Sequence, residues 1–196
     1  MLNEVFVKTY PAQPIDRREI LRYAGCLSET AEIGAALDAC LTASASAFTY
    51  RACYCVWTVE QFFEVFGRGS QTANTRLNGC SYVALFAGTV GLEIDRLVAK
   101  HLTLSPSNGV LLQAIGAERI ESLCDSVCKD FAVGAAEKGY TALPRFSPGY
   151  GDLPLEMQRE LCKVLDCARK IGVGLTDSLL MTPTKSVTAI VGFAKV

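Results

Sequence analysis

The chain has 196 residues, with 19 basic and 20 acidic side chains, one histidine and a formal net charge of −1. Half of the residues are hydrophobic and a fifth are charged, which excludes a disordered chain and predicts a folded protein with a sizeable core. Phosphate binding needs a clustered excess of lysine and arginine, so the near-neutral balance argues against a nucleic-acid-binding protein.

The N-terminal half predicts two helices and two strands. Asp16 and Glu19 have the spacing of a capping box, so a short helix is expected from there to Gly25. The periodicity predicts a second helix over residues 30–41, and an aromatic and β-branched run predicts a strand over 48–59. Residues 62–66 fit either a hairpin partner of that strand or a short helix. The apolar run at 81–87 is typical of a buried strand.

The C-terminal half predicts three helices and a final strand. A helix is expected over residues 92–102, a turn at 105–109, a long helix over 110–135 that Gly139 ends, and a loop over 143–150. Asp152 and Pro154 are start signals for a helix that ends near residue 171, and residues 186–196 predict a strand. Helices and strands are mixed along the chain, without the strict β-α-β order of parallel-sheet proteins. This favours an α+β fold with a largely antiparallel sheet.

The sequence indicates neither a membrane span nor a signal peptide. The longest weakly polar run, residues 81–92, is far shorter than the roughly 20 residues that a membrane-spanning helix needs. The first residues lack the basic and apolar regions of a signal peptide, so we expect a cytoplasmic protein.

Nine cysteines are spread along the chain. Their odd number and the expected reducing compartment favour free thiols over disulfides. No Cys-x-x-Cys pair is present, so thiols packed in the core are the favoured interpretation, and a metal or redox site is the alternative.

Several catalytic and cofactor motifs are absent. The chain has neither the Gly-x-Gly-x-x-Gly pattern of dinucleotide-binding folds nor the phosphate-binding P-loop. His101 is the only histidine, which excludes a zinc site built on a pair of histidines. The Asp-x-His-x-x-Gly pattern of cobalamin-carrying modules is also missing, so the chain is not expected to carry a corrinoid itself.

The long predicted helix carries a carboxylate at the edge of its apolar face. At about 100° per residue the apolar stripe is formed by Ile120, Cys124, Val127 and Phe131, and the opposite side by Arg119, Ser122, Ser126 and Lys129. Glu121 lies at the border. It could line a cleft, or it could be a boundary glutamate that reaches water, which is the commoner situation for this residue type.

The loop at residues 145–152 is the second candidate. Arg145 can hold a carboxylate through two parallel hydrogen bonds, and Tyr150 can offer its ring to a purine or a cation. The Pro148-Gly149 pair favours a turn whose backbone can approach a ligand closely. The same pattern also fits an ordinary surface turn.

Three blocks of sequence resemble one known family. Residues 81–95 are similar to its strand and Gly-Leu-Glu-x-Asp turn, and Arg-Phe-Ser-Pro-Gly-Tyr at 145–150 is similar to its Arg-Pro-Ala-Pro-Gly-Tyr signature. Residues 172–187 resemble its Gly-x-x-Leu-Thr-Glu-Ser-x-x-Met-x-Pro-x-x-Ser-Val block. The family is the C-terminal activation domain of cobalamin-dependent methionine synthase, which binds S-adenosylmethionine. The blocks occur in the family's order within residues 80–196, whereas residues 1–79 match poorly.

The resemblance implies a fold and a site. The fold would be a single C-shaped domain, residues 1–196, around a twisted antiparallel sheet flanked by helices. Arg145 corresponds to the arginine that contacts the methionyl part of S-adenosylmethionine, and Glu121 to the ligand-binding glutamate. The adenosyl site would be formed by Ser147, Gly149 and Tyr150. In this chain Phe146 and Ser147 replace the family's usual proline and alanine.

The resemblance also implies a function. The chain would be a free-standing reactivation subunit that positions S-adenosylmethionine for reductive methylation of the cobalamin of a methionine synthase lacking its own activation domain. No catalytic side chain and no metal ligand are assigned, because the cobalamin belongs to the partner and a flavodoxin-like or other donor supplies the electron. Two alternatives remain. The chain would activate another corrinoid methyltransferase system, or it would be a docking module that no longer binds S-adenosylmethionine.

Overall fold

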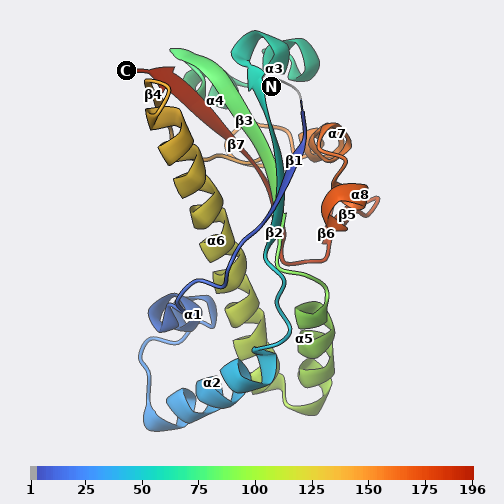
Figure 1. Cartoon of the computed structure of the whole chain (residues 1–196). Helices are drawn as coiled ribbons and strands as arrows, with labels where there is room; N and C mark the ends of the chain where they lie inside the picture. Colours follow the sequence, from blue (N-terminus) through green and yellow to red (C-terminus); the bar gives the residue numbers. More distant parts are fainter. Residues whose placement is uncertain (1–3) are drawn as a thin grey trace.

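The computed structural model describes residues 4–196 as an antiparallel sheet covered by helices on both faces (Figure 1). Five strands follow the order β1-β2-β3-β7-β4, with every neighbouring pair antiparallel. Their bounds are Phe6–Thr9 for β1, Arg51–Thr58 for β2, Cys80–Thr89 for β3, Ser186–Lys195 for β7 and Tyr140–Ala142 for β4. A small separate ladder joins β5, Gly174–Leu175, to β6, Met181–Thr182. The expected α+β class with a twisted antiparallel sheet flanked by helices is confirmed.

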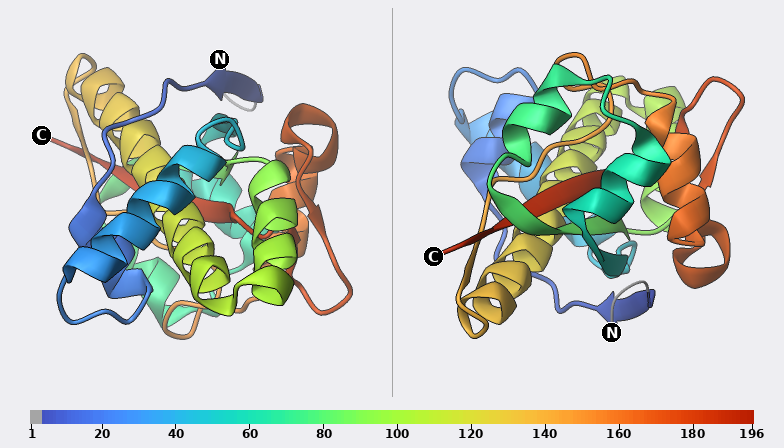
Figure 2. Two further views of the ribbon diagram at one scale, coloured as in Figure 1. Left: turned by 90° about the horizontal axis from the view of Figure 1, so that it is seen from below. Right: turned by 90° about the horizontal axis from the view of Figure 1, so that it is seen from above.

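The helices form one layer on each face of the sheet (Figure 2). The first layer consists of α1, Arg17–Tyr23; α2, Ala31–Ser44; α5, Glu93–Leu104; and α6, Pro106–Ala136. The second consists of α3, Val59–Phe66; α4, Gln71–Arg76; α7, Met157–Val164; and α8, Cys167–Ile171. Among the described residues, no helix is both long enough and apolar enough to cross a membrane.

The central strand β3 is buried on both faces. Its side chains alternate, so Ala84 and Phe86 enter the core beneath α6 while Val83 and Leu85 enter the core beneath α3 and α7. A strand between two helical layers needs apolar residues at every position, which explains the uninterrupted run that predicted it.

The turn predicted at residues 105–109 is wrong. Helix α6 begins at Pro106, and Ser105 alone separates it from α5. Proline is favoured at the first position of a helix because its missing N–H would have no partner there. Gly109 lies inside α6, where a Cβ atom would come within 2.8 Å of the Leu102 backbone nitrogen. The glycine therefore permits close packing of the two helices rather than a turn.

The single helix predicted to end near residue 171 is also wrong. The segment forms two short helices, α7 and α8, because Asp166 between them adopts a left-handed conformation with φ of 50°.

Residues 62–66, for which two interpretations were open, belong to helix α3. Thr58 and Gln61 form its capping box.

A buried ion pair holds the segment before α1 against α6. Asp16 caps α1 as predicted, but its own N–H donates to Oε1 of Glu118 at 3.2 Å instead of completing a capping box. Arg119, predicted on the solvent side of α6, is 3% exposed and pairs with Glu118. Its guanidinium also donates to the carbonyls of Gln13 and Pro14 at 2.6 and 2.9 Å. Arg119 can be buried because the adjacent Glu118 carboxylate neutralises its charge and the two carbonyls, about a hundred residues earlier, accept further hydrogen bonds from it.

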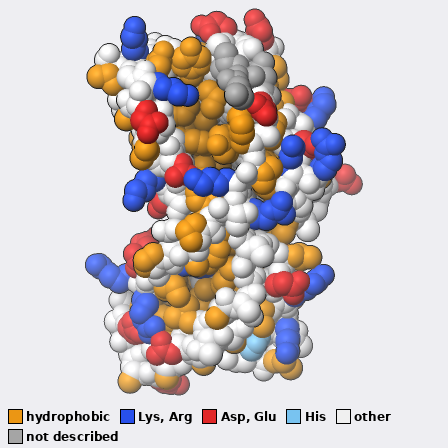
Figure 3. All heavy atoms as spheres, in the orientation of Figure 1, with side chains coloured by type: hydrophobic (Ala, Val, Ile, Leu, Met, Phe, Trp, Pro, Cys, Tyr) orange, Lys and Arg blue, Asp and Glu red, His pale blue; other side chains and the backbone are white. Residues whose placement is uncertain are grey.

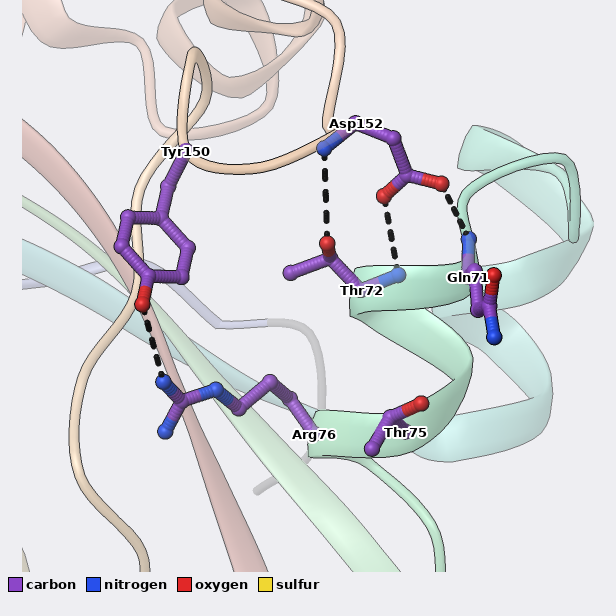
Figure 4. Close-up of a pocket in the computed structure, with 6 residues that line it drawn as sticks. All are labelled: Gln71, Thr72, Thr75, Arg76, Tyr150 and Asp152. Carbon is purple, nitrogen blue, oxygen red and sulfur yellow. Dashed lines mark hydrogen bonds between the residues drawn. The ribbon is translucent and has the colours of Figure 1, made fainter.

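The loop after β4 is fixed at both ends. Phe146 and Ile190 of β7 exchange two backbone hydrogen bonds of 3.0 and 2.8 Å. Further on, Asp152 caps α4 rather than starting the next helix. Its carboxylate accepts from the N–H groups of Gln71 and Thr72 at 2.6 and 2.9 Å (Figure 4). It also accepts from the Ser70 hydroxyl at 2.8 Å.

We predict that removing one partner of the buried pair is strongly destabilising. The change Arg119→Met leaves the Glu118 carboxylate buried without its cation, which should lower the free energy of unfolding by about 3–5 kcal/mol. Urea denaturation measures the loss. The control is Arg96→Met, which breaks an exposed pair with Glu93 and should cost less than about 1 kcal/mol. Equal losses in the two variants would contradict the assigned role of Arg119.

The Asp152 cap predicts a specific pH dependence. Hydrogen bonds from the Thr72 hydroxyl, the Thr72 and Gln71 N–H groups and the Ser70 hydroxyl hold the pKa of Asp152 well below its ordinary value. A carboxylate with a lowered folded pKa stabilises the fold above its unfolded pKa of about 3.9, and this stabilisation is lost as the pH falls toward the folded pKa.

The variant Asp152→Asn should therefore melt below the wild type at pH 7, and the gap should close as the pH falls below about 4. Scanning calorimetry across this range measures both melting temperatures. Glu64→Gln, which neutralises an exposed carboxylate of α3, is the control and should show no such convergence. A gap of constant size from pH 7 to pH 2 would show that the Asp152 charge does not stabilise the loop.

Candidate functional site

Arg145 and Glu121 lie in contact. The loop after β4 runs beside β7, and Phe146 enters the core beneath α3, so the flanking Arg145 side chain lies on the opposite side, toward α6. Its Nη2 atom is 2.7 Å from Oε2 of Glu121, and its Nη1 atom is 2.6 Å from Oδ1 of Asp125. Two carboxylates one helical turn apart thus share one guanidinium.

Asp125 is the residue that sequence reasoning missed. Its signal was its spacing, because residues i and i+4 of a helix lie on one face, and Asp125 is four residues after Glu121. The Arg145 side chain is 27% exposed, which keeps part of its guanidinium accessible. A guanidinium has five N–H donors, and the contacts to Glu121, Asp125 and Cys128 leave donors free for a further acceptor.

The surroundings of Arg145 raise its pKa and those of two neighbouring thiols. Partial burial by itself would lower the pKa of Arg145, but its hydrogen bonds to Asp125 and Glu121 outweigh this and raise it. Burial raises the pKa of the Cys124 and Cys128 thiols. Cys128 lies 3.9 Å from the guanidinium and still stays protonated at neutral pH, so it is a weak nucleophile.

A cavity of about 460 Å³ adjoins this cluster between α1 and α6. Glu121 and Asp125 form part of its wall, together with Asp16, Glu19 and Glu118. The only basic residue in the wall is Lys129, but Arg22, Arg119 and Arg145 pair with four of the five carboxylates, so most of the negative charge of the lining is neutralised. The volume falls in the range of small-molecule sites, and the carboxylate oxygens in the wall can accept hydrogen bonds from a ligand.

The other three predicted residues follow Arg145 on the loop. The carbonyl of Ser147 accepts the Tyr150 N–H at 3.1 Å, and the Gly149 N–H donates to Leu153 at 2.9 Å, so the turn is built before any ligand arrives. Gly149 has a φ of 85°, which favours glycine. The backbone N–H of Gly149 is occupied within the loop and is not free to bind a ligand.

Tyr150 lies apart from Glu121 and lines a different cavity. Its hydroxyl is 3.5 Å from Nη2 of Arg76, and the ring borders a hollow of about 430 Å³ between the loop and α4 (Figure 4). The structure therefore brings Glu121 and Arg145 together on the α6 side, while the Tyr150 ring points toward α4. The ring is 55% exposed and is accessible from this second side.

The cysteines are distributed through both cores. All nine are free thiols, and Cys40, Cys53, Cys55, Cys124 and Cys167 are buried. Within residues 4–196 no group of three or more histidine, cysteine, aspartate or glutamate side chains is placed to hold a metal ion.

Two comparisons with known proteins find a similarity, one in sequence and one in fold. The family model described as vitamin B12 dependent methionine synthase, activation domain, matches residues 135–195, which include the 145–150 loop. No curated protein matches the chain. Among solved structures, the chain is similar to a crystal structure of the MetH reactivation domain bound to AdoHcy, with a TM-score of 0.64 and 15% identity over 96% of this chain and 78% of that chain.

The structural likeness extends beyond the motifs. Since it covers 96% of the chain, it takes in most of residues 1–79, where the sequence motifs are not found. The resemblance to the activation domain of vitamin B12-dependent methionine synthase is therefore confirmed, in sequence over residues 135–195 and in fold over nearly the whole chain.

Proposed function

We propose that the chain binds S-adenosylmethionine at the Arg145–Glu121 cluster and presents its methyl group to the cobalamin of a partner methionine synthase. The observation that carries the proposal is the position of Arg145. This residue lies in the segment that the family model matches, and it pairs with two carboxylates that line the cavity between α1 and α6.

The donor set suits the ligand. S-adenosylmethionine has a carboxylate, an ammonium and a sulfonium at one end and an adenosyl group at the other. The remaining N–H donors of Arg145 can hold the carboxylate, and Glu121 with Asp125 can hold the ammonium. The carboxylates in the wall of the cavity can lie beside the positively charged sulfonium.

The adenosyl end is assigned to the loop. Ser147, Gly149 and Tyr150 form a turn whose shape is fixed by its internal hydrogen bonds and by the Asp152 cap. We assign the Tyr150 ring as the stacking surface for the purine. Because the ring points toward α4, the ligand would extend from the α6 side of the loop, across the turn, to its α4 side.

In this proposal the chain acts by positioning. When bound, S-adenosylmethionine supplies an activated methyl group, and the acceptor is the corrinoid of the partner. The residues of this chain bind the two ends of the ligand and fix the direction of the methyl group, which is a recognised source of rate enhancement. Because the Cys128 thiol beside the site stays protonated, it is a poor acceptor of the methyl group of the ligand.

The first test is ligand binding. Arg145→Ala should weaken the binding of labelled S-adenosylmethionine by about tenfold or more, because a charge-assisted pair with the ligand carboxylate is lost. Equilibrium dialysis measures the dissociation constants. Arg145→Lys keeps the positive charge but not the planar guanidinium, so its dissociation constant should lie between those of the wild type and of Arg145→Ala.

The control for that test is Arg169→Ala, which removes an exposed arginine of α8 paired with Asp166. It should bind the ligand as the wild type does. Circular dichroism of each variant separates a lost contact from a lost fold. Wild-type affinity in a folded Arg145→Ala protein would remove Arg145 from the site.

The second test addresses the free-standing role. The chain, added in trans with S-adenosylmethionine and a reductant, should restore methionine formation by an oxidised cobalamin-dependent synthase that lacks its activation domain. The visible spectrum of the corrinoid follows the same recovery. Arg145→Ala should slow it at limiting ligand. If recovery is the same without the chain, or if the chain restores only another corrinoid methyltransferase, the proposed partner is wrong.

A further inference from the structure

Three thiols meet in the core beneath α7 and α8. Cys53 lies on β2, Cys162 lies in the last turn of α7, and Cys167 is the first residue of α8. The side chain of Cys167 forms hydrogen bonds with both of the other thiols. Within residues 4–196 no such group is placed to hold a metal ion, and the proposed function uses none of the three. These adjacent thiols are therefore left without a role.

The turn between α7 and α8 brings two of these thiols together. Only residues 163–166 separate Cys162 from Cys167, and Asp166 takes the left-handed conformation that ends one helix and begins the next. As a result Cys167 enters the same core against which Cys162 packs. Because the two side chains are already in hydrogen-bond contact, a disulfide between them requires only a short approach of the sulfur atoms.

The two members of the pair differ in exposure. Cys167 is 0% exposed, whereas Cys162 is half-buried. Helices α7 and α8 lie at one edge of the molecule in Figure 1, and charged side chains gather along the same edge in Figure 3. A small solute in water can thus reach Cys162, while Cys167 is shielded from it.

The contact also makes the two thiols chemically unequal. The hydrogen bond from Cys167 lowers the pKa of Cys162 against the effect of partial burial, and it raises the pKa of Cys167. Cys162 therefore has the larger thiolate fraction, and the thiolate is the reactive form of cysteine. By contrast, burial raises the pKa of five other cysteines, which are Cys40, Cys55, Cys80, Cys124 and Cys128. A reactive, accessible thiol beside a second thiol is typical of peroxide-sensitive pairs.

We propose that Cys162 and Cys167 form a dithiol that reacts with hydroperoxides. The Cys162 thiolate attacks one peroxide oxygen and the O–O bond breaks, which gives a sulfenic acid on Cys162 and a leaving oxygen that takes up the thiol proton. The Cys167 sulfur then attacks the Cys162 sulfur, and the departing hydroxide takes the Cys167 proton and leaves as water. With hydrogen peroxide, the two thiols are oxidised to one disulfide and the peroxide is reduced to two molecules of water.

The experiment identifies which thiols become linked. The full, reduced chain is treated with an equimolar amount of hydrogen peroxide, the remaining thiols are blocked with iodoacetamide, and a tryptic digest is analysed by mass spectrometry without reduction. Trypsin cleaves after Arg159, Lys163 and Arg169, so the two cysteines fall on separate peptides, 160–163 and 164–169. The main oxidised product should be these two peptides joined, with a mass two hydrogens below their sum. A sample without peroxide should lack it.

The rate of oxidation gives an internal comparison. Cys128 is also half-buried, but its pKa is raised. Cys162 should therefore react with peroxide about tenfold faster than Cys128, because its larger thiolate fraction outweighs the weaker nucleophilicity of a more acidic thiol. Alkylation of samples taken at successive times measures both rates in the same protein.

Variants separate the two roles. In Cys162→Ser, Cys167 should stay reduced at equimolar peroxide. In Cys167→Ala the sulfenic acid of Cys162 has no partner, so it should persist and be captured by dimedone, which labels sulfenic acids. Cys26→Ser, which removes a half-buried thiol of the other core, is the matched control and should form the disulfide as the wild type does. Circular dichroism checks that each variant is folded, and because Cys162 is half-buried its variant tests the pair even if Cys167→Ala does not fold.

Three results would overturn the proposal. They are the absence of the joined peptides at equimolar peroxide, a main product in which Cys167 is linked to Cys53 instead, and oxidation of Cys162 that is no faster than that of Cys128. Arg145→Ala should form the disulfide as the wild type does while it weakens S-adenosylmethionine binding. Failure here is thus distinguishable from failure of the proposed function.

Discussion

Packing of the apolar stripe of α6 against the sheet is the contact on which the other features depend. Ile120, Cys124, Val127 and Phe131 enter the core that this helix shares with β2, β3 and β7. With that face fixed, the remaining faces of α6 meet two distant segments. One is the stretch before α1, held by the Glu118–Arg119 pair, and the other is the 145–150 loop, held through Arg145. A shift of α6 would therefore disturb the core, the N-terminal segment and the candidate site together.

The parts of the fold that could be predicted are those whose signal is local. The stripe of α6, the buried run of β3 and the β-branched β7 all follow from periodicity and composition. The errors arose where a distant partner decides. Strand β1 is mostly exposed and exists because it pairs with β2. Arg119 has the helical position of a solvent residue, and its burial depends on the Glu118 pair together with carbonyl partners at residues 13 and 14, which the helical pattern does not reveal.

The candidate site likewise has features that the sequence predicts and features that it does not. That Glu121 and Arg145 are suited to bind opposite charges could be read from the residues, and the contact between them is present. The involvement of Asp125 required knowing from which side Arg145 approaches the helix. The direction of the Tyr150 ring could not be derived from the turn motif, because it is set by Arg76 and by the Asp152 cap on α4. A turn sequence specifies local backbone shape, whereas side-chain direction depends on the surrounding elements.

The Asp152 cap has a consequence for how small a working version of this protein can be. The recognisable motifs all lie in residues 80–196, yet the partners of Asp152 are residues 70–72, and β3 completes its pairing with β2. A fragment trimmed to the familiar stretch would keep each signature while losing the helix that shapes the loop and a neighbouring strand of the sheet. Residues 70–72 and strand β2, though outside the known signatures, thus support the 145–152 loop and the β3 block.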